Sequence, residues 1–181
     1  MKTLNAITLA ILMAASTAAM AGDEASGRIH IKGYVSEPTC TVSADDAVIE
    51  LETISASELA QVPVGQAIEK GKKQTQLHLQ CDAPVSAEHI QLSMSGNAAA
   101  TGGTNVLQSN EDSGVGFAVL INNSTQLDIN DRFDTNLFQG AENLSSQSNV
   151  NAPLTIEYVR TGEEITGGEV NSDVTFTAVY R

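Results

Sequence analysis

The sequence predicts an all-β fold, a sandwich built from short strands. Apolar and polar residues alternate with period 2 along most of the chain, and β-branched residues are common in these segments. Polar turn-forming residues separate the alternating segments. One segment, 115–122, is nonpolar on both faces, which suits the middle of a sheet inside a sandwich. There is no internal repeat and no linker, so we expect a single domain.

Residues 1–21 are a targeting segment and not part of this fold. Lys2 supplies a positive end, residues 7–15 an apolar stretch, and residues 19–21 a small-x-small cleavage site. The apolar stretch is too short to span a bilayer, and no other segment approaches the ~20 apolar residues that a transmembrane helix needs. We therefore expect a cleaved signal peptide and an exported mature chain, starting at Gly22, with no direct membrane insertion.

The strands of the first half follow from alternation. Their clearest signals are Leu77, Leu79 and Cys81 in one segment and the Ile90, Leu92, Met94 series in the next, each implying one buried and one solvated face. The strands expected here are 27–36, 39–43, 47–52, 75–81 and 89–95. Between them, a short helical turn within 55–70 can be capped by Ser55 or Ser57, and Pro63 and Gly65 limit its length.

The second half contains the expected strands 104–108, 115–122, 154–160 and 173–180. The stretches 96–114 and 139–153 are rich in small and polar residues, which is the composition of loops. The final strand alternates strongly, and no hairpin partner follows it. Its apolar positions are Val174, Phe176, Ala178 and Tyr180.

A strongly apolar last strand without a following partner would leave a hydrophobic sheet edge, which natural proteins avoid or use. The mature N-terminus offers a matching strand with one apolar face. Its apolar or small positions are Ala25, Gly27, Ile29 and Ile31, each followed by a polar residue. Because this segment lies close to a free end, we expect that it can leave its own domain and serve a neighbour's core.

Cys40 and Cys81 are the only cysteines. In an exported protein an isolated pair usually forms a structural disulfide. The bridge would close a loop of ~41 residues, worth about 4 kcal/mol in the chain-entropy estimate. A metal or redox site is the alternative, but the close C-x-x-C spacing and a nearby pair of histidines are both missing.

Charge and motifs argue against other kinds of function. The net charge of −13 repels nucleic acid and anionic membrane surfaces. The three histidines, at 30, 78 and 89, fall on the polar faces of their strands, so we expect no metal site. The acidic loop 128–134 fails the EF-hand pattern, because Arg132 and Phe133 stand where an oxygen ligand and a glycine are needed. No catalytic or nucleotide-binding motif is present, so we expect neither an enzyme nor a cofactor.

Segments along nearly the whole mature chain resemble the subunits of chaperone-usher pili, most closely the major rod subunit family of type 1 fimbriae. Each segment is a weak signal alone, and their order and spacing carry the resemblance. The matching segments are 27–35, 38–42, 77–81, 113–117, 158–162, 167–170 and 173–181, the last with its penultimate Tyr180.

The resemblance implies an incomplete immunoglobulin-like sandwich that lacks its last strand, completed by a donor strand from the neighbouring subunit. It divides the mature chain into a donor-strand extension, residues 22–32, and a pilin domain, residues 33–181. The donor face is the Ala25, Gly27, Ile29 and Ile31 series, with Gly27 at the position where the acceptor has no room for a side chain. Asp23 departs from the apolar residue expected at the outer end.

The resemblance also implies the partners. A periplasmic chaperone first pairs with the C-terminal strand at Val174, Phe176, Ala178 and Tyr180, and its basic cleft holds the terminal carboxylate of Arg181. The outer-membrane usher then exchanges the chaperone strand for the extension of the next pilin subunit, identical or related. The implied location is a fimbria at the cell surface, reached through the periplasm.

The leading functional hypothesis is a structural fimbrial subunit that supports adhesion to surfaces or host cells. Two alternatives lie close to it. One is a minor adaptor or terminator pilin, of which a terminator should lack a workable acceptor site. The other is a receptor-binding adhesin, which in this family carries an extra lectin domain and no donor strand.

Overall fold

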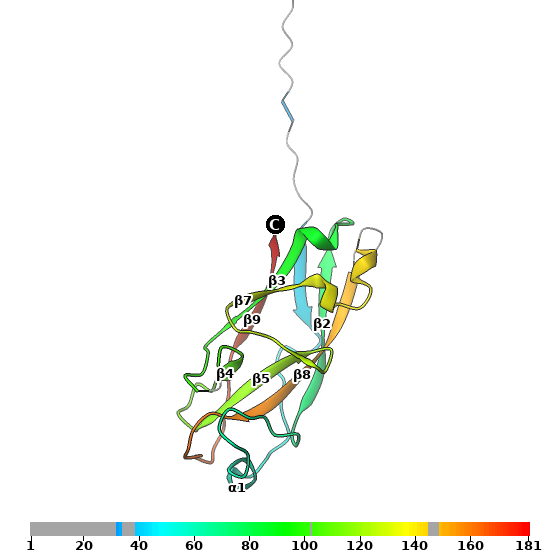
Figure 1. The fold of residues 1–181 in the computed structure, drawn as a ribbon. Helices are drawn as coiled ribbons and strands as arrows, with labels where there is room; N and C mark the ends of the chain where they lie inside the picture. The colour runs from blue at the N-terminus through cyan, green and yellow to red at the C-terminus, as the bar shows by residue number, and fades with distance from the viewer. Residues whose placement is uncertain (1–31, 34–38, 102, 145–148) are drawn as a thin grey trace, which may run out of the picture. The chain divides into compact units, whose positions relative to one another are not determined.

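The structure is a computed structural model that describes residues 32–33, 39–101, 103–144 and 149–181 (Figure 1). Nine strands are assigned in these residues: β1 (Cys40–Ala44), β2 (Lys73–Cys81), β3 (Ile90–Gly96), β4 (Val106–Gln108), β5 (Val115–Ile121), β6 (Thr125–Gln126), β7 (Asp131–Asp134), β8 (Asn149–Arg160) and β9 (Val174–Tyr180). The helical elements among them are α1 (Ala56–Leu59) and the single 3-10 turns η1 (Ala87–His89), η2 (Thr135–Leu137) and η3 (Ala141–Asn143).

The strands form two antiparallel sheets. The larger sheet has the order β1-β2-β8-β5-β4, with β6 paired to β5. The smaller sheet has the order β7-β3-β9. The apolar faces of both sheets belong to one core cluster, which lies between them. The predicted all-β sandwich is therefore confirmed.

The core consists of the alternating apolar residues that the sequence indicates. Leu77 and Leu79 of β2 are 1% exposed, and the apolar series of β3 is fully buried. Strand β5 lies between β8 and β4 and is buried on both faces. Its outward-facing Ala118 packs in a second, small cluster with Val106 and Val159. The prediction that this strand lies inside a sheet is confirmed.

The predicted helical turn is present as α1 and is held by a capping box. The Ser55 hydroxyl accepts a hydrogen bond from the Glu58 backbone N–H, and the Glu58 carboxylate accepts one from the Ser55 N–H at 3.0 Å. A hydrogen bond from Lys70 and those from Ser55 lower the pKa of Glu58 to about 2. Leu59 anchors the turn in the core.

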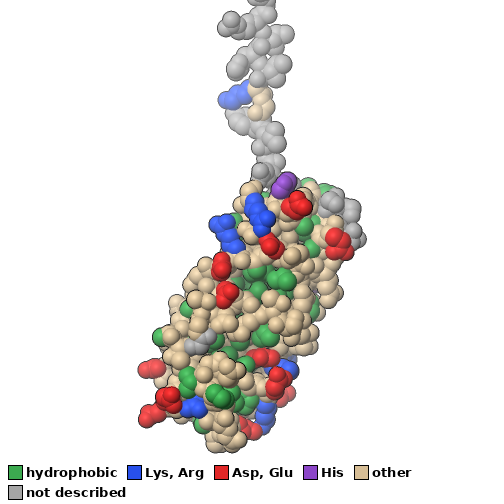
Figure 2. Space-filling model, in the orientation of Figure 1, with side chains coloured by type: hydrophobic (Ala, Val, Ile, Leu, Met, Phe, Trp, Pro, Cys, Tyr) green, Lys and Arg blue, Asp and Glu red, His purple; other side chains and the backbone are tan. Residues whose placement is uncertain are grey.

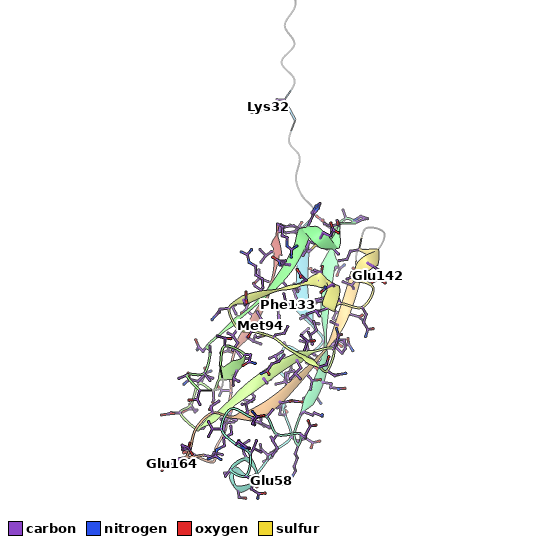
Figure 3. All side chains as sticks on the ribbon, in the orientation of Figure 1. Lys32, Glu58, Met94, Phe133, Glu142 and Glu164 are labelled. Carbon is purple, nitrogen blue, oxygen red and sulfur yellow. A yellow bond between two sulfur atoms is a disulfide. The ribbon has the colours of Figure 1, made fainter. Side chains whose placement is uncertain are left out.

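Arg160, at the end of β8, fastens the loops at the α1 end of the domain. Its guanidinium donates to four backbone carbonyls, those of Ala60 (2.8 Å), Val62 (3.0 Å), Gly162 (2.9 Å) and Glu163 (2.7 Å). Glu58 and Glu164 mark this end of the domain in Figure 3. The guanidinium satisfies carbonyls that no strand pairs, so it fixes the loops on both sides of β8.

Three expectations about the elements were wrong. Residues 47–52 form no strand: Ile49 and Leu51 pack against the core, but no ladder in the described residues includes them. The second part of the expected loop 139–153 is strand, because β8 begins at Asn149 and pairs with β2. The expected acidic loop 128–134 is strand in its second part, because β7 pairs there with β3. Strand β6 was also not predicted. The expected strand 27–36 lies outside the described residues except for Lys32 and Gly33, which are exposed.

Candidate functional site

Strand β9 is an edge strand with an apolar face. Among the described residues its one ladder partner is β3, with Tyr180 opposite Ile90 and Phe176 opposite Met94. The paired β3 residues are 0% exposed, whereas Phe176, Ala178 and Tyr180 are only partly buried. The apolar side chains of β9 therefore reach the core without being covered by it.

The backbone of β9 is also open on one side. The N–H of Arg181 donates to the carbonyl of His89 at 2.9 Å, so Arg181 and His89 form a hydrogen-bonded pair. In an antiparallel ladder such pairs alternate with pairs whose backbone groups point outward. The N–H and C=O groups of Tyr180, Ala178 and Phe176 consequently point away from β3.

Strand β1 presents the matching edge of the larger sheet. It pairs with β2, where Cys40 lies opposite Cys81 with their Cα atoms 4.0 Å apart, and the predicted disulfide joins them. The carbonyl of Thr39 accepts from the Asp82 N–H at 3.0 Å and so faces β2. By alternation the backbone groups of Cys40 and of Val42 point away from β2.

We call the region between these two edges the open side; it is defined by Cys40 and Val42 of β1 and by Phe176, Ala178 and Tyr180 of β9. Strands β1 and β9 lie next to each other. No ladder joins them in the part of the chain that the structure describes. The open side thus offers two rows of backbone donors and acceptors above half-buried apolar side chains.

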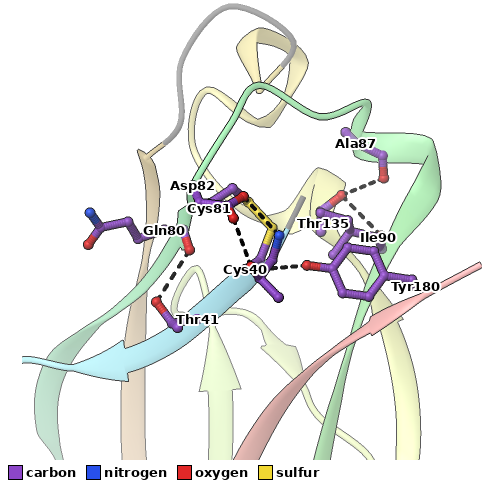
Figure 4. Close-up of a disulfide and its surroundings, with 10 residues drawn as sticks. Cys40, Thr41, Gln80, Cys81, Asp82, Ala87, Ile90, Thr135 and Tyr180 are labelled. Carbon is purple, nitrogen blue, oxygen red and sulfur yellow. Dashed lines mark hydrogen bonds between the residues drawn. A yellow bond between two sulfur atoms is a disulfide. The ribbon is translucent and has the colours of Figure 1, made fainter. Parts of the chain in front are cut away.

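One hydrogen bond crosses the open side at its disulfide end (Figure 4). The backbone N–H of Cys40 donates to the hydroxyl oxygen of Tyr180. The Thr39 N–H and hydroxyl donate to the Asp82 carboxylate, each at 2.8 Å, which fixes the start of β1. Sequence reasoning placed Tyr180 in the alternation and, by resemblance, in the chaperone-pairing strand. It missed this contact, because the partner of a hydroxyl group does not follow from periodicity.

The side chain of Arg181 binds to β7 and to the η1 turn that precedes β3. Its guanidinium forms an ion pair with Asp134 of β7 and donates to the Glu88 carbonyl at 3.4 Å. These contacts hold the end of β9 in register beside β3. The predicted chaperone-pairing residues Val174, Phe176, Ala178 and Tyr180 thus lie on β9, and the last three of them line the open side. Arg181 follows β9 directly, and its side chain turns toward β7. The predicted donor-strand residues Ala25, Gly27, Ile29 and Ile31 lie outside the described residues.

The described part of the chain offers few residues for catalysis or metal binding. His78 pairs with Asp45 at 2.6 Å, and His89 is exposed. The described residues contain no group of three or more side chains that could hold a metal ion. None of their helices is long and apolar enough to cross a membrane. In Figure 2 the charged side chains of the visible face gather toward the two ends of the domain, with uncharged side chains between them.

The two-sheet sandwich, its β1–β2 disulfide and the open apolar edge of β9 define an incomplete immunoglobulin-like fold, as in a pilus subunit. The sequence model of the family described as Fimbrial protein matches residues 29–181. The chain therefore belongs to the fimbrial protein family. It is a structural pilus subunit that assembles with other pilins, and not an enzyme.

Relatives with known sequences or structures span nearly the whole chain. The fimbrial-like protein YbgD of Escherichia coli (strain K12) is 25% identical over 198 residues, covering 99% of this chain and 97% of the relative. A subunit in the structure of a chaperone-usher pilus superposes with a TM-score of 0.58 at 16% identity, covering 87% of this chain and 97% of that one. The P pilus rod subunit PapA gives 0.57 at 16% identity, covering 86% and 100%. These structural likenesses support the fold.

Proposed function

We propose that this protein is the repeating rod subunit of a surface fimbria and polymerises by donor-strand exchange. In this proposal residues 22–32 of one subunit enter the open side of the next and pair with β1 and β9. The observation that carries the proposal is the half-exposed apolar face of β9 beside outward-pointing backbone groups. A donor strand at one end and an acceptor elsewhere make a head-to-tail contact that does not close, and such contacts build filaments.

The expected free energy of this contact is large. Burial of Ile29 and Ile31 contributes roughly 1.5 to 3 kcal/mol each. Each backbone hydrogen bond to the two free edges adds ~0.5 to 1.5 kcal/mol net. Because the inserted strand becomes part of a core, its release requires partial unfolding of the acceptor. The joint is then stable kinetically as well as thermodynamically.

Before polymerisation the open side needs a temporary cover, because exposed apolar edges promote aggregation. We assign this role to a periplasmic chaperone that adds a strand beside β9, with an outer-membrane usher directing the later exchange. Val174, at 36% exposure the most exposed apolar residue of β9, and the half-buried series that follows it would be covered first by the chaperone and then by the next subunit. The assembled fimbria would support adhesion to surfaces or host cells.

A terminator subunit has no need of an acceptor for an incoming strand. The unpaired edge of β9 therefore favours a subunit that accepts a donor, which is the rod role or the adaptor role. Rod and adaptor subunits differ in copy number along the fibre. Quantifying this subunit against the others in purified fimbriae separates them.

The substitution Gly27→Arg tests the donor role. An arginine on the inserted face should leave folding and chaperone capture intact but prevent this subunit from acting as donor. The measurement is the ladder of SDS-resistant polymers, which should collapse on boiling, in cells that make the whole assembly system. Gly167→Arg is the matched control, because Gly167 is exposed and a Cβ there would meet nothing within 4 Å.

A second arm, Gly33→Arg, fixes the register of the donor strand. Positions 27 and 33 share one face of an alternating strand, so either glycine can occupy the narrow part of the acceptor. If Gly33→Arg alone abolishes the ladder, the glycine in the narrow part of the acceptor is Gly33. The donor strand then lies six residues later in the sequence, and the exchange mechanism still holds. A normal ladder with both substitutions would refute donor-strand exchange through this segment.

A further inference from the structure

The side chain of Tyr180 extends from the smaller sheet to the edge of the larger one. It belongs to the last residue of β9, and its hydroxyl accepts a hydrogen bond from the backbone N–H of Cys40, the first residue of β1 (Figure 4). A single side-chain hydrogen bond therefore links the two edges of the open side at its disulfide end.

The direction of the Cys40 N–H follows from the pairing of β1. Cys40 and Cys81 form a directly opposed pair with the short Cα separation of 4.0 Å, and Thr39 supplies the hydrogen bond to β2. The N–H of Cys40 thus points away from β2, outward from the free edge of the larger sheet. It is part-buried, and a buried backbone donor without a partner is costly. The Tyr180 hydroxyl supplies that partner in the free subunit.

A strand that enters the open side would bring a partner of its own. Its carbonyl groups would pair with the outward-pointing N–H groups of β1, and Cys40 carries the first of these. The Tyr180 hydroxyl therefore occupies one of the hydrogen-bonding positions that the incoming strand requires.

We infer that the Tyr180 hydroxyl is a placeholder at the disulfide end of the open side, which an inserted strand must displace from the Cys40 N–H. This inference rests on the proposed strand exchange and adds a residue that sets its rate. The hydroxyl keeps the end of the site satisfied while it is empty. Insertion is then an exchange of one hydrogen bond for another, and it favours strands whose backbone reaches Cys40.

The placeholder role differs from that of the Tyr180 ring. The ring packs against the core beside β3, as a phenylalanine also would. Tyr180→Phe therefore removes the hydroxyl and keeps the packing. Tyr158→Phe is the matched control: it removes the other tyrosine hydroxyl of the described domain, on the buried β8 strand, where the ring packs 5.6 Å from Phe117.

The experiment follows capture of a fluorescent synthetic peptide with the sequence of residues 22–36 by the mature chain, using anisotropy. Tyr180→Phe should capture the peptide about three to ten times faster than wild type, the effect of one net hydrogen bond. Tyr158→Phe should match wild type. Amide hydrogen exchange provides a second measurement without peptide: the Cys40 N–H should exchange faster in Tyr180→Phe alone.

An association rate for Tyr180→Phe at or below the wild-type value would overturn the placeholder role. Unchanged exchange at Cys40 would overturn the hydrogen bond on which it rests. If none of the three folded proteins captures the peptide, the proposed strand exchange itself fails. In that case the exchange measurement still reports the Tyr180–Cys40 contact separately.

Discussion

Strands β3 and β9 lie side by side in one sheet and carry the same pattern, yet their environments differ. Met94 of β3 and Phe176 of β9 are direct partners, and so are Ile90 and Tyr180. The β3 residues are completely buried, and the β9 residues remain partly exposed. The cause is coverage: β3 has strands on both edges, β7 and β9, whereas β9 has β3 alone among the described strands.

This difference separates stability from binding. A fully covered apolar residue contributes its transfer free energy to the fold of its own subunit. A partly exposed apolar residue contributes only part of its transfer free energy to its own subunit. The rest is gained when another strand covers it. In the proposed strand exchange, β3 holds the domain together and β9 offers the binding edge, although the two strands look alike in sequence.

The largest expected effect on stability comes from truncating a buried residue of the covered strand β3. Leu92→Ala on β3 should lower the free energy of unfolding by about 2–5 kcal/mol, because Leu92 is 0% exposed and truncation leaves a cavity. Urea denaturation monitored by circular dichroism measures the loss. Ser93→Ala, the next residue on the opposite face, is the control and should change stability little. A cost for Leu92→Ala of less than 1 kcal/mol would contradict the covered core seen at β3.

Truncation of the half-covered strand should cost the free subunit less. Phe176→Ala removes a ring that packs edge-on against Phe133, with 6.5 Å between ring centroids, but remains partly exposed. We expect a loss of about 1–2 kcal/mol, below the 3–5 kcal/mol of a fully buried Phe. Urea denaturation without the 22–36 peptide measures it.

With the peptide bound, the same substitution should cost more, because the inserted strand would have covered the ring. The extra loss appears as weaker stabilisation of Phe176→Ala by saturating peptide. Thr177→Ala, on the exposed face of β9, provides the control. Equal costs with and without peptide would show that β9 is as fully covered in the free subunit as β3.

Alternation identified the strands whose apolar residues have a core to face. It predicted β2, β3, β5 and β9 to within about two residues at each end. It was wrong at 47–52, where Ile49 and Leu51 alternate correctly but find no partner strand. It missed β7, which has one apolar residue, Phe133, and is recognisable only through its ladder with β3. The alternation of a segment indicates which way its side chains face. Whether the segment becomes a strand also depends on a pairing partner that lies far away in the sequence.

The candidate site was predictable to the same extent. The apolar series of β9 and the Cys40–Cys81 pairing followed from alternation and from cysteine count. The orientation of the β1 edge did not, because it depends on which pairs of the ladder are hydrogen-bonded. Nor did the Tyr180–Cys40 contact, which joins residues 140 positions apart through a hydroxyl whose partner no local rule specifies.

The smallest expected effect tests coverage on the larger sheet. Glu157 of β8 lies directly opposite Ala118 of β5 and is 9% exposed. This burial raises the pKa of its carboxyl group. The negative charge of Glu69 raises this pKa further, and the positive charge of Lys72 lowers it. A raised folded-state pKa means that the folded protein holds a proton which the unfolded chain releases at lower pH. Stability therefore falls as pH rises above about 4.5 through the folded-state pKa.

Glu157→Gln should remove this penalty. The variant should match wild type below about pH 4, where both folded and unfolded wild-type chains are protonated at this position. At pH 7 the variant should be more stable by a few tenths of a kcal/mol, because it no longer carries the buried carboxylate charge of residue 157. Thermal unfolding at several pH values measures the difference, with Glu164→Gln on an exposed loop as control. A constant offset between Glu157→Gln and wild type at every pH would assign the change to packing and would show that the coverage of β8 does not reach its carboxylate.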